Sequence, residues 1–429
     1  MKRILYQDTQ RVQGLLKDNK ELGSKEQIET VRKILEDVRE EGYEAVRGYT
    51  RNFDKIDLNE GAFRVTKDEI DRAVESVEPA FIEAMKLAIG NIEAYHRKQM
   101  QEGYLEEKEA GVLLGQLIRP LDRVGLYVPG GTAAYPSSVA MTAVPAKVAG
   151  VNHIVMITPP DKDGHLNPYT LAAAFLAGVT EIYKVGGAQG IGALAYGAGP
   201  LEKVDKIVGP GNIYVTLAKK MVVGSVDIDM LAGPSEILVI ADEGAKPEFI
   251  AADLLSQAEH DPLASSILIT FSDSYANQVE AEVERQLLTM ERENIARASI
   301  DDNGAIIIVK TKEEAISFAN QYGPEHLELA VAEPLVWLDQ IRNAGAIFLG
   351  YYTPEPIGDY FAGPNHVLPT NGTSRFYSPL NTQTYLKKTS IISYTKEAIL
   401  KNGRHIETLA AVEGFGGHKN AITVRLKDE

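Results

Sequence analysis

The stretch Val-Gly-Leu-Tyr-Val-Pro-Gly-Gly, residues 124–131, shows the pattern that decides the fold. A short apolar run, Val124–Val128, is followed at once by a proline and two glycines. A buried strand followed by a glycine-rich turn is typical of a parallel sheet whose strands alternate with helices. Similar runs recur at residues 154–157, 182–185, 207–208, 237–240, 267–270, 306–309 and 347–349. The sequence therefore predicts an α/β fold, with either two successive parallel sheets or one sheet interrupted by an insertion.

The segment before this region is predicted to be largely helical. Ser24 and Gln27 form a capping box, in which each side chain bonds the backbone of the other residue at a helix start. Thr66 and Glu69 repeat the same spacing. Residues 1–23 are mostly polar with one small apolar patch, which predicts an arm rather than part of the core.

The segment after the repeated runs is predicted to be irregular at first and then regular again. Residues 351–379 are rich in proline, glycine and asparagine, which is typical of a long loop. Residues 396–412 predict a helix, and residues 421–426, after a glycine-rich turn, predict a final strand.

The composition is that of a globular protein with an acidic surface. The chain has 429 residues, of which 44% are apolar and 24% charged, with a formal net charge of −16 and a pI near 5.1. This charge argues against nucleic acid or an anionic membrane as the main partner. No apolar run reaches the roughly 18 residues that span a bilayer, and the first residues lack the apolar core of a signal peptide. We expect a cytoplasmic protein.

The chain contains no cysteine, and this restricts its chemistry. Disulfides, thiolate metal ligands and a cysteine nucleophile are all excluded. A transition metal would have to be bound by histidine, aspartate, glutamate or glutamine. If the protein oxidises an aldehyde, it cannot do so through a thiohemiacetal.

The stretch Ser-Gln-Ala-Glu-His-Asp-Pro, residues 256–262, ends an apolar-periodic segment that predicts a helix. Gln257 and His260 are three residues apart, so they share one face of a helix and could ligate a metal. The alternative is a solvated helix end that binds nothing. Asp359, beside a glycine, and His418, after two glycines, would complete a dispersed set of nitrogen and oxygen ligands suited to zinc.

Glu325 and His326 follow a Gly-Pro turn, where two adjacent side chains can reach the same cavity. Histidine titrates near neutrality and suits proton abstraction from a hydroxyl group. A buried glutamate with a raised pKa could activate water. The alternative is a helix N-terminus at which Glu325 complements the helix dipole.

Three glycine-rich stretches follow apolar runs, at residues 129–131, 186–192 and 209–212. Each could present backbone N–H groups to a phosphate at a helix N-terminus, and tight structural turns are the alternative. Gly190 and Gly192 fall in a loose GxGxxA dinucleotide fingerprint, but no acidic residue ends the next strand to bind a ribose.

Several of these stretches together resemble one family, histidinol dehydrogenase. They are GLYVPGG (125–131), GGAQ (186–189), VGPGNIY (208–214), AGPSE (232–236), QAEHD (257–261), GPEHL (323–327), GDYFAGPNHVLPT (358–370) and EGFGGH (413–418). They occur in order over most of the chain, so the resemblance is specific.

The resemblance implies a zinc-dependent enzyme that oxidises L-histidinol to L-histidine, through the aldehyde, with two NAD. It implies that Gln257, His260, Asp359 and His418 bind one zinc ion per subunit, and that Glu325 and His326 are the acid–base pair. It implies a substrate site of Ser235, Gln257, His260, His326, Asp359, Glu413 and His418, and NAD contacts from Tyr127, Gln189 and Asn212. No role for His366 is implied.

The resemblance also implies a fold of two incomplete Rossmann-like domains in an intertwined homodimer. We expect an arm over 1–23, a first domain over 24–126 and 238–380, an NAD-binding domain over 127–237, and a C-terminal segment over 381–429. The C-terminal segment, which contains Glu413 and His418, would reach the active site of the partner subunit.

One departure from the family pattern concerns the nucleotide. The family usually has alanines where this chain has Gly190 and Gly192, so the apparent fingerprint is coincidental and NAD would bind in a non-Rossmann manner. The residues alone are also compatible with two other classes of protein. A zinc hydrolase could use the same ligands with Glu325 activating water, and a non-enzymatic protein could simply bind metal.

Overall fold

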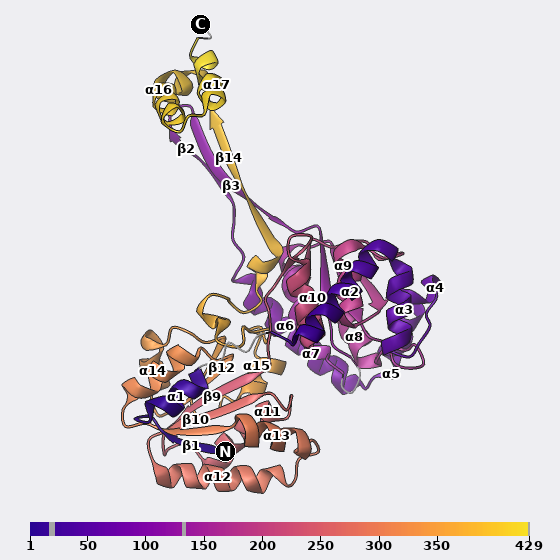
Figure 1. The fold of residues 1–429 in the computed structure, drawn as a ribbon, viewed down its shortest axis with the longest axis vertical. Coiled ribbons are helices and arrows are strands. Elements are labelled where there is room, and N and C mark those ends of the chain that lie inside the picture. Colours follow the sequence, from indigo (N-terminus) through magenta and orange to yellow (C-terminus); the bar gives the residue numbers. More distant parts are fainter. Residues whose placement is uncertain (17–21, 131–133, 428–429) are drawn as a thin grey trace. The chain divides into compact units, whose positions relative to one another are not determined.

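The computed structural model describes residues 1–16, 22–130 and 134–427 (Figure 1). The chain divides into two compact units, each built from two segments of the sequence. The large unit comprises Met1–Lys98 and Asp122–Tyr385, and the small unit comprises Gln99–Leu121 and Leu386–Glu429. The large unit contains two separate parallel sheets, which confirms the first of the two arrangements predicted from the repeated apolar runs.

The first sheet has six strands in the order β1-β11-β10-β9-β12-β13, and every neighbouring pair is parallel. The strands are β1 (Lys2–Leu5), β9 (Glu236–Ala241), β10 (Ser265–Thr270), β11 (Ala305–Ile308), β12 (His326–Ala330) and β13 (Ala346–Leu349). The helices around it are α1 (Thr9–Leu16), α11 (Pro247–Ala258), α12 (Asp273–Leu287), α13 (Glu293–Asn303) and α14 (Lys312–Tyr322).

Both faces of this sheet are buried, which is why its strands are continuous apolar runs. Along β9, Ile237 and Val239 pack with α11, α12 and α13, whereas Leu238 and Ile240 pack with α1 and α14. Successive side chains of a strand point to opposite faces, so one strand contributes to two cores.

The start of the chain differs from the predicted arm. Residues Lys2–Leu5 form β1, which pairs in parallel with β11, and Ile4 is buried in the core. The partner strand lies about 300 residues further along the sequence, and four residues are too few to show a strand by their own periodicity. Residues 17–21 of the predicted arm lie outside the described residues.

The second sheet has five strands in the order β6-β5-β4-β7-β8, again all parallel. The strands are β4 (Arg123–Tyr127), β5 (His153–Thr158), β6 (Glu181–Lys184), β7 (Lys206–Val208) and β8 (Asp227–Ile228). They alternate with α7 (Pro136–Ala149), α8 (Pro168–Ala177), α9 (Gly187–Tyr196) and α10 (Ile213–Val222). The decisive run at residues 124–128 thus supplies the central strand; Gly131 of the following turn lies outside the described residues.

The N-terminal helices are α2 (Lys25–Glu41), α3 (Tyr43–Phe53), α4 (Glu60–Phe63), α5 (Lys67–Ser76) and α6 (Pro79–Arg97). Both predicted capping boxes, at Ser24 and Thr66, are present with reciprocal hydrogen bonds. Val31 and Leu35 of α2 share a core with Val155 of the five-stranded sheet. The domain boundaries given above stay a prediction.

The small unit is an antiparallel sheet with two helices (Figure 1). It contains β2 (Tyr104–Glu109), β3 (Val112–Pro120), β14 (Leu386–Tyr394), α16 (Lys396–Val412) and α17 (Gly416–Leu426). The predicted helix over 396–412 is confirmed, but the predicted strand over 421–426 is wrong, because these residues end α17. Ile422 and Leu426 are one helical turn apart and both lie against Gly403 of α16, so helix packing decides the structure.

The remaining short helices lie in the connections that follow β12 and β13. They are η1 (Pro334–Gln340), α15 (Glu355–Tyr360), η2 (Thr373–Arg375) and η3 (Thr382–Tyr385). The predicted loop over 351–379 is therefore irregular apart from the short α15 and η2. Within the described residues, no helix has both the length and the apolarity needed to cross a membrane.

Candidate metal and catalytic site

A cluster of histidines and carboxylates lies at the amino ends of β9 and β12, where these two strands pair. Helix α14 ends at Gly323, whose φ of 62° is in the left-handed region that favours glycine at a helix end. The proline that follows leads directly to Glu325 and then to His326, the first residue of β12. The helix N-terminus considered for Glu325 is therefore not what the structure shows.

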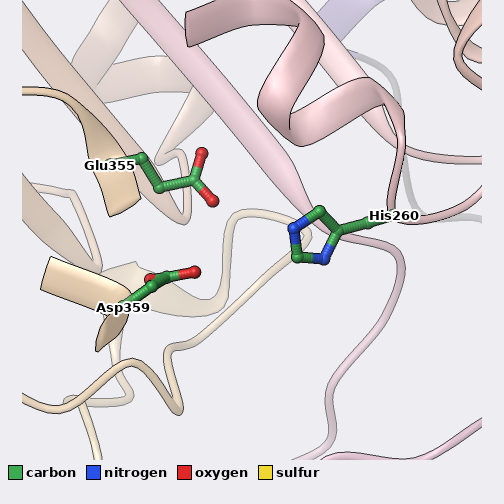
Figure 2. Close-up of side chains that lie close together, drawn as sticks. All are labelled: His260, Glu355 and Asp359. Atoms are coloured by element: carbon green, nitrogen blue, oxygen red, sulfur yellow. The ribbon is translucent and has the colours of Figure 1, made fainter. Parts of the chain in front are cut away.

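His260, Glu355 and Asp359 form the part of this cluster that could hold a metal ion. Their ligand atoms all lie within 4.8 Å of one another, and Figure 2 shows the two carboxylates facing the imidazole ring. Both acidic residues belong to the short helix α15, one turn apart, whereas His260 follows α11. His260 is exposed, Asp359 is half-buried and Glu355 is buried.

Gln257 lies in the last turn of α11 and is completely buried. In the described part of the chain, neither its Oε1 nor its Nε2 has a hydrogen-bond partner. Helix α11 ends at Ala258, so His260 lies in the following turn and does not share a helix face with Gln257 as predicted. A buried amide without partners costs free energy unless a ligand or ion satisfies it, so these residues fit a bound metal.

His326 is buried and its two ring nitrogens have different surroundings. Nδ1 lies 3.1 Å from the carbonyl oxygen of Glu236, which fixes Nδ1 as the protonated nitrogen and leaves the lone pair on Nε2. Nε2 lies 3.8 Å from Asp359 Oδ1 and 3.9 Å from Glu355 Oε1. Burial lowers the pKa of His326, with Asp359 and the Glu236 carbonyl opposing the change, so the ring is suited to accept a proton.

Glu325 is anchored by the same backbone unit as His326. Its Oε2 accepts a hydrogen bond of 2.9 Å from the N–H of Glu236, while the carbonyl of Glu236 faces His326. Burial raises the pKa of Glu325 well above its ordinary value, although the hydrogen bond opposes this. One peptide position in β9 thus holds both predicted bases in one place.

The carboxyl groups of α15 also titrate abnormally. Burial raises the pKa of Asp359 to about 7; the neighbouring Glu355 carboxylate adds to the rise and His326 opposes it. Burial raises the pKa of Glu355 to about 8, with Asp253 adding to the rise. Buried acids that repel one another are what a bound cation would stabilise.

Glu355 was missed by the reading of the sequence. It stands between Pro354 and Pro356, four residues before Asp359. On a helix this spacing places two carboxylates on one face, so the signal was present once α15 was recognised. Because residues 351–379 were predicted to be a loop, the helical spacing of Glu355 and Asp359 was not considered.

The residues predicted to bind NAD lie at the other sheet, next to the carboxyl ends of its strands. Tyr127 ends β4, and its hydroxyl accepts a hydrogen bond of 3.3 Å from the N–H of Gly187. Gln189 lies in the first turn of α9, buried, and its Oε1 has no partner among the described residues. Asn212 is exposed and caps α10 by accepting hydrogen bonds from the N–H groups of residues 214 and 215.

These positions surround the point where the strand order reverses. From β4 the chain proceeds to β5 and β6 on one side, and then to β7 and β8 on the other. In open parallel sheets, ligands bind in the crevice at such a point. Gly209, just after β7, has φ 113°, and a Cβ there would lie 2.2 Å from the carbonyl oxygen of Tyr127, so only glycine permits this approach.

A model of the family described as histidinol dehydrogenase matches residues 17–426. The chain belongs to the histidinol dehydrogenase family. A histidinol dehydrogenase of Heliobacterium mobile is 57% identical over 397 residues, covering 92% of this chain and 93% of the relative. A histidinol dehydrogenase of Listeria innocua is 53% identical over 422 residues, 98% of each chain. These matches confirm the resemblance, and the chain is thus an NAD-dependent oxidoreductase of histidine biosynthesis in a family whose zinc dependence is known.

The fold is that of the histidinol dehydrogenases as well. The crystal structure of histidinol dehydrogenase from Elizabethkingia anophelis superimposes with a TM-score of 0.94 at 40% identity, covering 100% of this chain and 98% of that one. The two parallel sheets and the small antiparallel sheet are therefore features of the family fold.

The structure brings most, but not all, of the predicted histidinol dehydrogenase site residues together. Ser235 lies directly before β9, at the same strand ends as His326. Glu413 and His418 belong to the small unit, where both are exposed, so the predicted metal ligands are divided between the two units. His366 lies in the loop after α15, and its Nε2 has no partner among the described residues.

Proposed function

We propose that the cluster at the amino ends of β9 and β12 binds zinc and L-histidinol and oxidises the alcohol to L-histidine with two NAD. One observation carries the proposal: His260 and Asp359 converge beside the buried His326, and Gln257, in the last turn before His260, is buried without hydrogen-bond partners among the described residues. Membership in the histidinol dehydrogenase family indicates that the substrate is L-histidinol. We also propose a cytoplasmic location, which this biosynthetic role supports.

The proposed metal ligands are Gln257, His260 and Asp359 of one subunit and His418 of the partner subunit. They provide two imidazole nitrogens and two oxygens, a set that suits zinc, at one ion per subunit. When bound, the ion would hold the substrate's nitrogen atoms as a template and polarise its reacting oxygen.

The first step follows from the free lone pair of His326. Nε2 accepts the proton of the substrate hydroxyl as hydride leaves the adjacent carbon for the nicotinamide ring of the first NAD. The alcohol becomes an aldehyde, and the proton remains on the imidazole until it is released. The neutral ring that burial favours is the state this step requires.

The second step needs water, because the chain has no cysteine to form a covalent adduct. Glu325, in its ionised form, takes a proton from water as the water oxygen adds to the aldehyde carbon, and it then returns this proton to the former carbonyl oxygen, which gives the neutral hydrate. His326 then accepts a hydroxyl proton of the hydrate as the second hydride leaves for the second NAD. The product is the carboxylic acid. The common anchor on Glu236 holds both proposed bases next to each other, so they could act on one bound substrate.

NAD would bind at the five-stranded sheet, within the domain predicted over residues 127–237. Tyr127, Gln189 and Asn212 surround the reversal of strand order, where the N-termini of α9 and α10 favour a pyrophosphate. The nucleotide would lie at the carboxyl ends of these strands but bind in a non-Rossmann manner, because the GxGxxA stretch is coincidental.

The small unit supports a homodimer with shared active sites. Apolar side chains are exposed on β14, α16 and the turn that follows, including Ile392, Leu409, Val412 and Phe415. A second copy of this chain would cover them, and an isologous pair would place each His418 at the partner's cluster.

A hybrid dimer tests this sharing. One subunit carries His418→Asn and the other His326→Asn, with different tags so that only hybrids are purified. One of the two sites then contains an intact set, so we expect about half of the wild-type activity from two inactive parents. An inactive hybrid containing folded subunits would contradict shared sites.

A further inference from the structure

A second pair of carboxyl groups, the half-buried Asp253 and the buried Glu328, lies next to the cluster of His260, Glu355 and Asp359, because Glu328 contacts Glu355. Glu328 is two residues after His326 on β12, so both side chains point to the same face of the sheet. Asp253 lies on α11, one helical turn before Gln257. The two carboxyl groups are hydrogen-bonded to each other.

Glu328 also contacts the start of α15. Pro354 and Pro356 flank Glu355, and neither proline has an amide hydrogen. Pro354 cannot cap the helix with its side chain, so the N–H of Glu355 needs an acceptor from elsewhere. Glu328 Oε1 accepts that N–H at 2.8 Å, in the buried interior. The β12 strand therefore supplies the cap that the sequence of α15 lacks.

The position of α15 matters because this helix presents both acids of the metal cluster (Figure 2). With six residues it is too short to be stable by its own hydrogen bonds. A second anchor is the ring of Phe348, which lies so close to Gly358 that a Cβ there would be 2.8 Å from Cε1. The location of Asp359 thus depends on contacts at both ends of one short helix.

We propose that Glu328, held by Asp253, is a positioning residue that fixes α15 and thereby places Asp359 for metal binding. Its carboxyl group bridges the Asp253 side chain and the Glu355 backbone, and it is not one of the proposed metal ligands. The inference rests on the proposed role of Asp359 as a ligand.

Two substitutions whose side chains are similar in length to glutamate distinguish the effect of the hydrogen bonds of Glu328 from the effect of its volume. In Glu328→Gln, the amide oxygen can accept the Glu355 N–H while the amide nitrogen donates to Asp253. Glu328→Met keeps the bulk and removes both bonds. Zinc affinity is measured by competition with a chelator, beside thermal unfolding of the metal-free protein and the KM and kcat for histidinol.

We expect Glu328→Met to weaken zinc binding about 10- to 100-fold, which is the usual effect of mutating residues that hold metal ligands in place. We also expect it to raise the KM for histidinol. Glu328→Gln should bind zinc within about threefold of wild type, because both hydrogen bonds can form. A folded methionine variant with wild-type zinc affinity would overturn the proposal. Equal loss in both variants would also overturn it.

A further variant separates this inference from the proposed ligand set. Asp359→Asn should lose zinc affinity whatever the role of Glu328. If it loses affinity and Glu328→Met does not, only the positioning role fails; if it retains zinc, the ligand set fails. Should Glu328→Met not fold, Asp253→Asn and Asp253→Leu make the same comparison from the other side of the pair.

Discussion

The two parallel sheets carry their candidate site residues at opposite ends of their strands. In the six-stranded sheet, Ser235, Glu325 and His326 lie at the amino ends of β9 and β12. In the five-stranded sheet, the predicted NAD contacts are Tyr127, which ends β4, Gln189, which lies just after β6, and Asn212, which lies just after β7. The first sheet gathers buried acids and histidines, whereas the second offers glycine-rich turns and helix starts.

The helices next to these strand ends explain the difference. Helices α11 and α14 finish at the amino ends of the six-stranded sheet, with their carbonyl groups and partial negative charge. Helices α9 and α10 begin at the carboxyl ends of the five-stranded sheet, with the partial positive charge of their N-termini, and the side chains of Tyr127 and Asn212 accept some of their first N–H groups. One region therefore favours a cation and the other an anion, as a metal and a dinucleotide would require.

The largest expected effect is on turnover and concerns His326, the proposed general base in the six-stranded sheet. His326→Asn should lower turnover about 10³-fold, within the range that general-base catalysis contributes, because no other group accepts the hydroxyl proton. Steady-state NADH formation measures this, and zinc content should remain that of the wild type. Unchanged turnover would remove His326 as the base.

The next effect concerns metal affinity. Asp359→Asn should weaken zinc binding by about 100-fold or more, beyond what outer residues of metal sites contribute. Glu259→Gln is the matched control, because Glu259 neighbours His260 in sequence but does not belong to the metal-binding group. Chelator competition measures both variants. Equal losses would show that local charge, rather than ligation, explains the effect.

The acidity of the cluster predicts how zinc affinity changes with pH. The pKa of Asp359 without metal is about 7, so below this pH zinc must displace a proton. Affinity should therefore fall about tenfold per pH unit below 7 from this group and level off above it. Titrations between pH 5.5 and 8.5 measure the slope, and Asp359→Asn should reduce it by about one proton. A flat profile for the wild type would argue that Asp359 stays ionised.

The smallest effect should appear at the five-stranded sheet. Gln189→Ala should raise the KM for NAD about tenfold, the cost of one or two lost hydrogen bonds, and leave zinc affinity unchanged. Kinetics at saturating histidinol, together with chelator competition, check both parts. A change in zinc affinity would show that the two sheets do not carry separate functions.

Much of the fold was predictable because its strands are buried on both faces and therefore form apolar runs. Residues 124–128 predicted β4 correctly, and the capping box at Ser24 predicted the start of α2. The strand at Ile4 was not predictable, because its partner, Ile307, is about 300 residues away. Residues 421–426 fit both an alternating and a helical pattern, and only packing against Gly403 decides between them.

The candidate site was predictable where one stretch combines unusual residues, as around His260 and His326. Gln257, His260 and Asp359 were expected to meet; the structure brings His260 and Asp359 together, and this convergence depends on the fold and could not be derived from spacing. Glu328 and its contact with α15 could not be found at all. Its neighbours in sequence are ordinary strand residues, and its partner lies 27 residues further along the chain.

The most direct test of the account is the stoichiometry of NADH formation from L-histidinol, followed at 340 nm with the zinc-loaded protein. We predict two NADH per histidinol consumed, with L-histidine as product, loss of the signal after treatment with a chelator, and its return when zinc is added. A flat trace from folded protein with zinc bound would contradict the assignment of the amino-end cluster as the site of this oxidation.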